Sequence, residues 1–430
     1  MDLSGIARQK STETNSPPKG GDPLETLRDR SIYIETYGCR YNFGDTAKLT
    51  EVLKYRGNVI VSKPELADAV IINTCTVVGS TERRMLRRLS LFRDVDLYVT
   101  GCMPAVQREA ILSVCDPTFI PSDMIHCQYR TVRTIGSDSV GIVQIAQGCT
   151  GTCSYCITRL ARGVLRSYGT EEILAQVGAF IRAGSAEIQL TAQDVSAWGT
   201  DTGTGISSLL QALGTLEGGH KIRVGMMNPA TAKNHTNELV AAFENDHFFR
   251  FIHLPVQSGS DSILDAMGRK YTVAEFEEIV RAFREKYPSI TLATDVIVGF
   301  PGECEEDFLA TVDLIRRIRP DKVNVTRYSR RPFTTPSAAR EVPDSVKKDR
   351  SRFLARVSSK ICTSEHEHMI GTIRPFIVTE ILREGSVMAR SPEYTGIVLH
   401  ETLPIGMRGF ALLKKDRNYF FIGERVKSGP

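Results

Sequence analysis

The sequence lacks the features that mark secreted and membrane proteins. It has no uninterrupted apolar run long enough to cross a bilayer, and its N-terminus has no apolar core of a signal peptide. An excess of charge is also missing, since 54 Lys and Arg face 50 Asp and Glu and leave a net charge of +4. We therefore expect a soluble protein without a membrane partner, on which any nucleic-acid surface is a local patch.

Ten cysteines in a chain without secretion signals favour metal ligands and free thiols in a reducing cytoplasm over disulfides. Cys149, Cys153 and Cys156 lie in a glycine-rich loop that follows an apolar, strand-like run at 140–145. Three thiolates that bind an iron–sulfur cube leave one iron open to a substrate or cofactor. A structural zinc loop is the alternative, but zinc usually takes four ligands, and no fourth Cys or His lies nearby in the sequence.

The N-terminal part predicts a disordered tail followed by a small domain. Residues 1–30 are polar and rich in Ser, Thr, Pro and Gly, which indicates disorder. Over 31–135, strands beginning at Ser31 and at 69–73 and 96–100 alternate with helices at 45–55 and 81–92, a pattern typical of a parallel α/β sheet. Cys39, Cys75 and Cys102 each follow a strand end, where such sheets collect ligands. These cysteines predict a second three-thiolate cluster, with unrelated buried cysteines as the alternative.

The segment 136–365 predicts a partial (β/α)6 barrel. Strand-like runs at 140–147, 186–191, 222–226, 251–254, 291–298 and 322–326 are separated by helical patterns at 170–183, 206–213, 236–243, 272–287 and 305–318. By analogy with full barrels, chemistry is expected at the carboxyl ends of the strands. The cysteine loop follows the first strand and so belongs at that mouth.

Polar residues near other strand ends are candidate cofactor contacts. The polar groups of a cofactor need hydrogen-bond acceptors, and its flat rings need close backbone approach. The candidates are Gln193, Asp194, Gln257, Ser258, Asp295 and Gly299, together with Tyr155 between two of the loop cysteines. Turn formation is an equally good explanation for the glycine, and simple packing for the tyrosine.

Two further segments point to RNA. Arg327, Arg330 and Arg331 belong to a basic stretch with prolines, and guanidinium groups match phosphate oxygens. From 366 to 428, five short strand patterns at 373–380, 386–390, 395–399, 409–415 and 418–421 predict a small β-barrel, an architecture common among oligonucleotide-binding modules.

Together these parts resemble the radical S-adenosylmethionine methylthiotransferases from Ser31 to Val426. The match comprises Tyr37-Gly-Cys39, Asn73-Thr-Cys75, Thr100-Gly-Cys102, the C-x3-C-x2-C loop, and the segments 253–260, 267–271 and 295–302. The resemblance implies an N-terminal domain with an auxiliary [4Fe-4S] cluster, a radical core with a second [4Fe-4S] cluster that binds and cleaves S-adenosyl-L-methionine, and an RNA-binding barrel called TRAM.

The run from Ile157 to Ser167 resembles the archaeal and eukaryotic branch of that family. This resemblance implies that N6-threonylcarbamoyladenosine at position 37 of tRNA receives a methylthio group at C2 of the adenine. Arg159 and Arg162 would meet the substrate carboxylate or RNA phosphates. An external electron donor and a sulfur source are implied, and we expect a monomer. The alternatives are methylthiolation of an aspartate in a ribosomal protein and a non-catalytic iron–sulfur RNA-binding protein.

Overall fold

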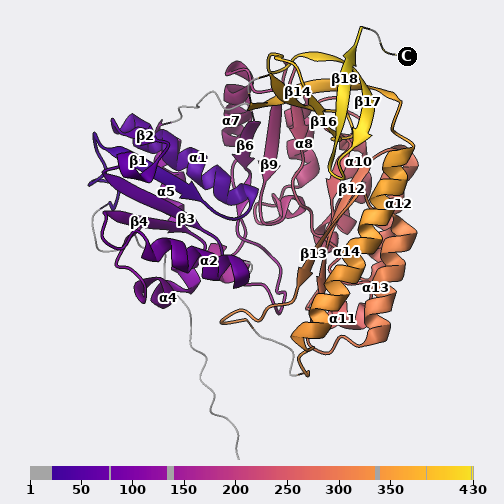
Figure 1. Cartoon of the computed structure of the whole chain (residues 1–430), viewed down its shortest axis with the longest axis horizontal. Coiled ribbons are helices and arrows are strands. Elements are labelled where there is room, and N and C mark those ends of the chain that lie inside the picture. The colour runs from indigo at the N-terminus through magenta and orange to yellow at the C-terminus, as the bar shows by residue number, and fades with distance from the viewer. Residues whose placement is uncertain are drawn as a thin grey trace, which may run out of the picture.

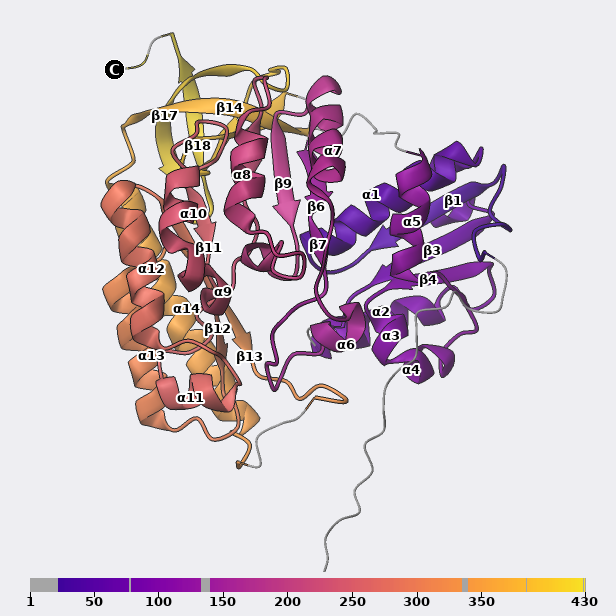
Figure 2. The same ribbon diagram turned by 180° about the vertical axis from the view of Figure 1, so that it is seen from behind.

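The computed structural model describes residues 22–76, 79–132, 140–334, 339–383, 385–427 and 429. An N-terminal sheet lies beside a half-open barrel, and a small β-barrel caps one end of that half-open barrel (Figures 1 and 2). Most of the predicted tail, residues 1–21, lies outside the described residues. Within the described ranges, no helix is both long and apolar enough to span a bilayer.

The N-terminal unit is a parallel sheet with the strand order β2-β1-β3-β4-β5. Its buried strands read as apolar runs because helices cover both faces. Alternate residues of β3 serve the two faces, so Ile71 packs with α1 and α5 while Val70 and Ile72 pack with α2. The strands are β1 (Ser31–Thr36), β2 (Val59–Val61), β3 (Ala69–Thr74), β4 (Leu97–Gly101) and β5 (Thr118–Phe119). The helices are α1 (Arg40–Tyr55), α2 (Gly79–Ser90), α3 (Met103–Val106), α4 (Arg108–Leu112) and α5 (Ser122–Val132).

Two predictions at the start of this unit are wrong. Residues 22–30 are not a tail, because Leu24 and Leu27 are fully buried against α1 and α5 and Asp22 pairs with Arg56 at 2.6 Å. Helix α1 also begins at Arg40, five residues before the predicted start at Asp45. Its early turns contain Gly44, and glycine is unfavourable inside a helix. Gly44 nevertheless packs closely on the side chain of Gln144.

The half-open barrel confirms the predicted (β/α)6 pattern. Two three-stranded parallel sheets, β6-β9-β10 and β11-β12-β13, are joined by bridges from Ile222 to Phe248 and from Met226 to His253. The strands are β6 (Val140–Gln144), β9 (Glu187–Thr191), β10 (Lys221–Arg223), β11 (Phe251–His253), β12 (Thr291–Val298) and β13 (Lys322–Arg327). The outer helices are α7 (Thr170–Arg182), α8 (Ile206–Gly214), α10 (Thr236–Ala242), α12 (Val273–Lys286), α13 (Glu305–Ile318) and α14 (Asp344–Glu367). Their apolar faces and the strands form the largest core of the protein.

The connection after β6 contains the cysteine loop. It continues through the short strand β7 (Ala146–Gln147), which pairs antiparallel with β8 (Arg166–Ser167), and the five-residue helix α6 (Thr158–Arg162) lies between them. Two more short helices, α9 (Pro229–Ala232) and α11 (Asp261–Ala266), follow β10 and β11.

The C-terminal strands close into the predicted barrel, in the order β14-β15-β16-β18-β17. Side chains that include Val378, Ile397 and Phe421 fill its interior, whereas Tyr419 points to solvent. The strands are β14 (Ile373–Arg383), β15 (Ser386–Arg390), β16 (Gly396–Leu399), β17 (Arg408–Asp416) and β18 (Phe420–Val426).

This C-terminal barrel docks at the amino ends of the half-barrel strands. Tyr394, between β15 and β16, donates a 2.5 Å hydrogen bond to Glu187 at the start of β9. The backbone N–H of Arg250, just before β11, donates to the carbonyl of Pro392 at 2.7 Å. The C-terminal barrel and the cysteine loop therefore lie at opposite ends of the half-open barrel (Figure 2).

Candidate active site

Three cysteines gather at the carboxyl ends of adjacent strands in the N-terminal sheet. Cys39 follows β1 and caps α1, Cys75 follows β3, and Cys102 follows β4. The loop before Cys39 passes tightly over the second cysteine: a Cβ added to Gly38 would lie 2.7 Å from the Cβ of Cys75 and 3.0 Å from its sulfur. Gly38 also has a φ of +107°, which favours glycine. Cys39 is exposed, while Cys75 and Cys102 are buried.

The amide of Asn42 ties the three cysteine loops together. Its Nδ2 donates to the carbonyl oxygens of Tyr37, in the first loop, and of Thr74, in the second, both at 2.8 Å. Its Oδ1 lies 3.7 Å from the sulfur of Cys102, the third cysteine. Asn42 is fully buried, so each of these contacts replaces a hydrogen bond to water. The predicted convergence of the strand ends therefore has a specific side chain that maintains it.

The pKa of the Cys102 thiol is raised to about 11, mainly by burial. The neighbouring guanidinium of Arg162 lowers this pKa, while the nearby thiols of Cys75 and Cys39 raise it. A thiol in this place gives up its proton at neutral pH when a metal replaces it. Within the described ranges, no group of three or more His, Cys, Asp or Glu side chains is close enough to hold a single metal ion. A cube differs from such a site because each thiolate binds its own iron.

The second set of cysteines lies on the loop after β7. Gly148 starts the loop with a φ of +81° and leaves no room for a Cβ against the carbonyl of Val164. Its N–H donates to Oε1 of Gln193 at 2.6 Å, which anchors the loop to the end of β9. The Gly151 N–H donates to the sulfur of Cys149 at 3.2 Å, and a Cβ at Gly151 would approach the sulfurs of both Cys149 and Cys153. All three loop cysteines are partly exposed.

Arg269 is a site residue that was not predicted. Its Nη1 lies 3.7 Å from the sulfur of Cys153 and 3.3 Å from Oδ1 of Asn228. Burial raises the pKa of Cys153, and the charge of Arg269 opposes that rise. The backbone of Met267 also accepts a hydrogen bond from Ser154 at 2.9 Å. The only sequence signal was the run Met267–Tyr271, which resembled the family without indicating a role.

Asp194 and Gln193 form hydrogen bonds with other residues of the protein in this structure. Asp194 is fully buried and accepts hydrogen bonds from Ser196, from the backbone of Asn228 and from the hydroxyl of Thr231. Burial raises its pKa, although these donors lower it. Its carboxylate thus joins the ends of β9 and β10, and Gln193 holds the cysteine loop.

A polar triad crosses the interior of the half-open barrel. Nε2 of His253 on β11 lies 2.9 Å from Oδ1 of Asp295 on β12, and Nδ2 of Asn324 on β13 donates to the same oxygen at 2.7 Å. Although burial raises the pKa of Asp295, its hydrogen bonds with His253 and Asn324 bring the net value below the ordinary range. Asp295 therefore stays charged at neutral pH, and its contacts with His253 and Asn324 both involve Oδ1.

The remaining predicted cofactor residues lie near the carboxyl ends of the strands of the half-open barrel. Gln257 has a φ of +69° and pairs through its backbone with Asp295 and Ile297, while Ser258 is buried beside Thr311. The N–H of Gly299 donates to Glu303 at 2.6 Å, and its α-carbon packs on Lys347 of α14. Tyr155 lies edge-on to Phe300, with ring centroids 6.2 Å apart. Turn formation explains Gly299 as well as a ligand would, and the contact of Tyr155 with Phe300 is compatible with either role that was predicted for this tyrosine.

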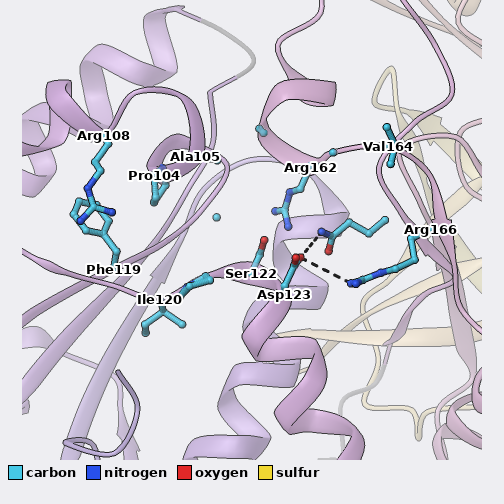
Figure 3. A pocket seen from close by; sticks show the side chains of 15 residues that line it. Pro104, Ala105, Arg108, Phe119, Ile120, Ser122, Asp123, Arg162, Val164 and Arg166 are labelled. Carbon is cyan, nitrogen blue, oxygen red and sulfur yellow. Dashed lines mark hydrogen bonds and ion pairs between the residues drawn. The ribbon is translucent and has the colours of Figure 1, made fainter. Parts of the chain in front are cut away.

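Arg162 joins the two sets of cysteines. It is the last residue of α6, its side chain is 1% exposed, and its Nε donates to the sulfur of Cys102 at 3.2 Å. Its Nη2 contacts Asp45 and Oδ1 of Asn42, each at 2.7 Å. Although burial lowers it, the Asp45 carboxylate helps to hold the pKa of Arg162 well above its ordinary value. Arg162 also lines a cavity of about 480 Å³ between the N-terminal unit and the segment 147–166 (Figure 3).

Two of the predicted RNA contacts are wrong for this structure. Arg162 is buried as described, and Arg331 is buried in an ion pair with Glu82 of α2 and also donates to Thr76. Neither guanidinium is available to a phosphate. Arg159, Arg327 and Arg330 are exposed, as an RNA contact requires.

Comparisons with known proteins agree with this arrangement. Residues 143–315 match the radical SAM superfamily, and residues 31–119 match an uncharacterized protein family, UPF0004. The chain is 38% identical, over 91% of its length and 99% of the relative, to a probable threonylcarbamoyladenosine tRNA methylthiotransferase of Pyrococcus abyssi. It is 30% identical, over 86% of its length and 68% of the relative, to the threonylcarbamoyladenosine tRNA methylthiotransferase of Homo sapiens.

The chain belongs to the threonylcarbamoyladenosine tRNA methylthiotransferase family. It is thus an enzyme with a radical SAM domain. The fold of that domain is also found in the radical S-adenosylmethionine methyltransferase TsrM of Kitasatospora setae, with a TM-score of 0.51 at 14% identity, over 69% of this chain and 73% of that chain.

The cysteines of this methylthiotransferase family member suit iron–sulfur clusters. Radical SAM membership implies S-adenosyl-L-methionine and one [4Fe-4S] cluster, for which the loop of Cys149, Cys153 and Cys156 supplies three thiols. For the N-terminal set, the observation is a donor without an acceptor: Nε of Arg162 donates to Cys102, while Nη1 of the same guanidinium is buried and has no hydrogen-bond partner among the described residues. A sulfide acceptor beside Cys102 fits that donor.

Proposed function

We propose that this enzyme adds a methylthio group to C2 of the adenine in N6-threonylcarbamoyladenosine at position 37 of tRNA. The observation that carries the proposal is the meeting of two sets of three cysteines at one interface, joined through Arg162. The high identity to full-length relatives that are named for this reaction supports the substrate. A radical source alone would need only one of the two sets.

Each set would hold one [4Fe-4S] cluster. We call the cluster on Cys149, Cys153 and Cys156 the radical cluster, and the cluster on Cys39, Cys75 and Cys102 the auxiliary cluster. When bound, the radical cluster would supply the electron that cleaves S-adenosyl-L-methionine, and the auxiliary cluster would carry the sulfur that is transferred. The family relationship implies an external electron donor, and the transferred sulfur requires a source.

The chain's own residues orient this chemistry. Gln193 and Arg269 hold the radical-cluster loop, and Asn42 holds the auxiliary set. The partly exposed carboxylate of Asp295 is a suitable acceptor for a ribose hydroxyl or an ammonium group of S-adenosyl-L-methionine. Gln257, Ser258, Gly299 and Tyr155 line the same end and remain candidates for the adenine.

The tRNA would approach from the side of the cysteine loops. The exposed side chains of Arg159, Arg327 and Arg330 lie on α6 and at the end of β13, on the carboxyl side of the half-open barrel. The target base must leave the anticodon loop to reach a site between two units, and single-stranded loops make bases available in this way. The C-terminal barrel is at the far end, so it would contact a different part of the tRNA.

Monomeric state and a reducing cytoplasm complete the proposal. All ten cysteines are free in the structure, which agrees with a compartment that keeps thiols reduced. We expect one chain to contain both cluster sites.

The test is anaerobic reconstitution with iron and sulfide, followed by incubation of tRNA with S-adenosyl-L-methionine, sulfide and dithionite. We expect about eight irons per chain, since each cube holds about four, and a methylthio form of threonylcarbamoyladenosine by mass spectrometry. Cys75→Ala should bind about four irons, form no product and still release 5′-deoxyadenosine. Cys127→Ala, which removes an exposed thiol, is the matched control. About four irons in the unaltered chain, with no thiolated nucleoside, would overturn the proposal.

A further inference from the structure

The guanidinium of Arg162 and the backbone beside it connect the two cysteine sets directly. Nε of Arg162 donates to the sulfur of Cys102 at 3.2 Å. The carbonyl of the next residue, Gly163, accepts a hydrogen bond from the N–H of Cys149 at 3.3 Å. Residues 162–163 thus connect Cys102 of the auxiliary set to Cys149 of the radical set, with one hydrogen bond to each.

The surroundings of Arg162 hold it in one orientation. Asp45 and Asn42 bind its Nη2 at 2.7 Å each, and the guanidinium carbon lies 4.9 Å from the ring centre of Tyr41. A buried cation is costly unless it is paired, and the carboxylate of Asp45 provides the pairing here. The planar fork with several fixed donors fits this place in a way that a lysine ammonium does not.

We propose that Arg162 is a positioning residue of the auxiliary cluster, which it holds against the radical-cluster loop and whose reduction potential it raises. The proposal rests on the proposed function. Hydrogen bonds to cluster sulfurs and nearby positive charge stabilise the reduced, more negative state of an iron–sulfur cluster. Nη1 of Arg162, for which the described part of the chain supplies no hydrogen-bond partner, offers a further donor on the same guanidinium. An auxiliary cluster with a higher potential accepts an electron more readily, so the electron supply to the two clusters depends on this residue.

The experiment isolates the auxiliary cluster in the full chain. Cys149, Cys153 and Cys156 are replaced by Ala, iron and sulfide are reconstituted, and the midpoint potential is measured by a mediated redox titration followed by electron paramagnetic resonance. Arg162→Met in this background should shift the midpoint to a lower potential. Arg162→Lys, which keeps the charge but loses the fork, should fall between the two. Arg281→Met, which removes an exposed arginine on α12, should leave the potential unchanged.

The outcomes separate this inference from the proposed function. If the background chain with Arg162 intact binds no iron, the auxiliary cluster itself is absent and the proposed function fails. If the cluster forms in both chains and Arg162→Met leaves its potential and spectrum unchanged, the role of Arg162 is overturned. Should Arg162→Met remain folded by circular dichroism yet lose its iron, recovery of iron in Arg162→Lys would support the positioning role. If Arg162→Lys also lacks iron, a positive charge at this position does not hold the cluster, and that part of the proposal is contradicted.

Discussion

Arg331, at the end of the half-open barrel, forms a buried ion pair with Glu82 of α2 in the N-terminal unit. The side chains are 6% and 19% exposed, and Arg331 also donates to Thr76, next to Cys75. This ion pair is a second contact between the two units, in addition to the contact made by Arg162. Arg331 lies about 170 residues after Arg162 in the chain. The two units that contain the cysteine sets are held together from two sides.

Removal of this ion pair should weaken the interface. Arg331→Met leaves Glu82 without its partner, and loss of one member of a buried pair costs about 3 kcal/mol of the free energy of unfolding. The double variant Arg331→Met with Glu82→Gln should recover part of that loss, because neither charge is then left alone. Urea denaturation of the unaltered chain, Arg331→Met, Glu82→Gln and the double variant measures the coupling. Equal stability of Arg331→Met and the unaltered chain would show that the pair does not bear on the interface.

A buried histidine at the same interface should make stability depend on pH. His126 of α5 stacks on Tyr168 at 3.9 Å and contacts Lys48 at 2.9 Å and Glu172 at 3.4 Å. Burial, with the charges of Lys48, Arg166 and Arg130, lowers the pKa of His126 to about 3.

The sign follows from proton binding. The unfolded chain binds a proton at His126 below about pH 6.5 while the folded chain does not, so the stabilisation is fully present above that pH and falls on acidification. The loss is at most about 1.4 kcal/mol per pH unit from this group. Urea denaturation at several values between pH 7 and pH 5 should show a steeper decline for the unaltered chain than for His126→Gln. Parallel declines would contradict the lowered pKa.

Arg269 should be needed for the radical cluster alone. Loss of its contacts to Cys153 and Asn228 in Arg269→Met removes the charge that faces the loop. Residues that support metal ligands typically contribute about 10- to 100-fold in metal affinity or activity. We expect 5′-deoxyadenosine formation to fall by about that factor, with auxiliary iron retained. Arg281→Met, an exposed arginine on α12, serves as the matched control.

The sequence was sufficient to predict the places of the cysteines but not the side chains that join them. Parallel strands bring their carboxyl ends together, so Cys39, Cys75 and Cys102 could be grouped from their positions alone. The partners of Arg162 and Arg331 lie in another unit, 60 or more positions away in the sequence, and no periodicity indicates which of them each arginine will meet. Arg331 was therefore predicted to meet RNA phosphates because it lies in a basic stretch, and Arg162 to meet the substrate carboxylate or RNA phosphates because of the family resemblance.

The same limit applies to residues whose role depends on a neighbouring loop. Asp194 was predicted as a cofactor ligand from its strand-end position, yet its oxygens bind Ser196, Asn228 and Thr231. Leu24 lies in a polar segment, and only the packing of α1 and α5 shows that it is part of a core. Local composition predicts neither result.

Tyr394 should anchor the C-terminal barrel to the half-open barrel. Its hydroxyl donates to the fully buried carboxylate of Glu187 and accepts from Gln189 at 3.2 Å, and its ring lies between Phe249, Phe251 and the guanidinium of Arg390. Tyr394→Phe keeps the ring but leaves a buried carboxylate with one donor fewer, which costs about 1–3 kcal/mol. Because the change lies at the end opposite the cysteine loops, S-adenosyl-L-methionine cleavage should be unaffected while thermal unfolding begins at a lower temperature. Tyr419→Phe, in which an exposed tyrosine of the same barrel loses its hydroxyl, should leave the unfolding temperature unchanged. If both variants unfold like the unaltered chain, the Tyr394 hydroxyl does not hold the two barrels together.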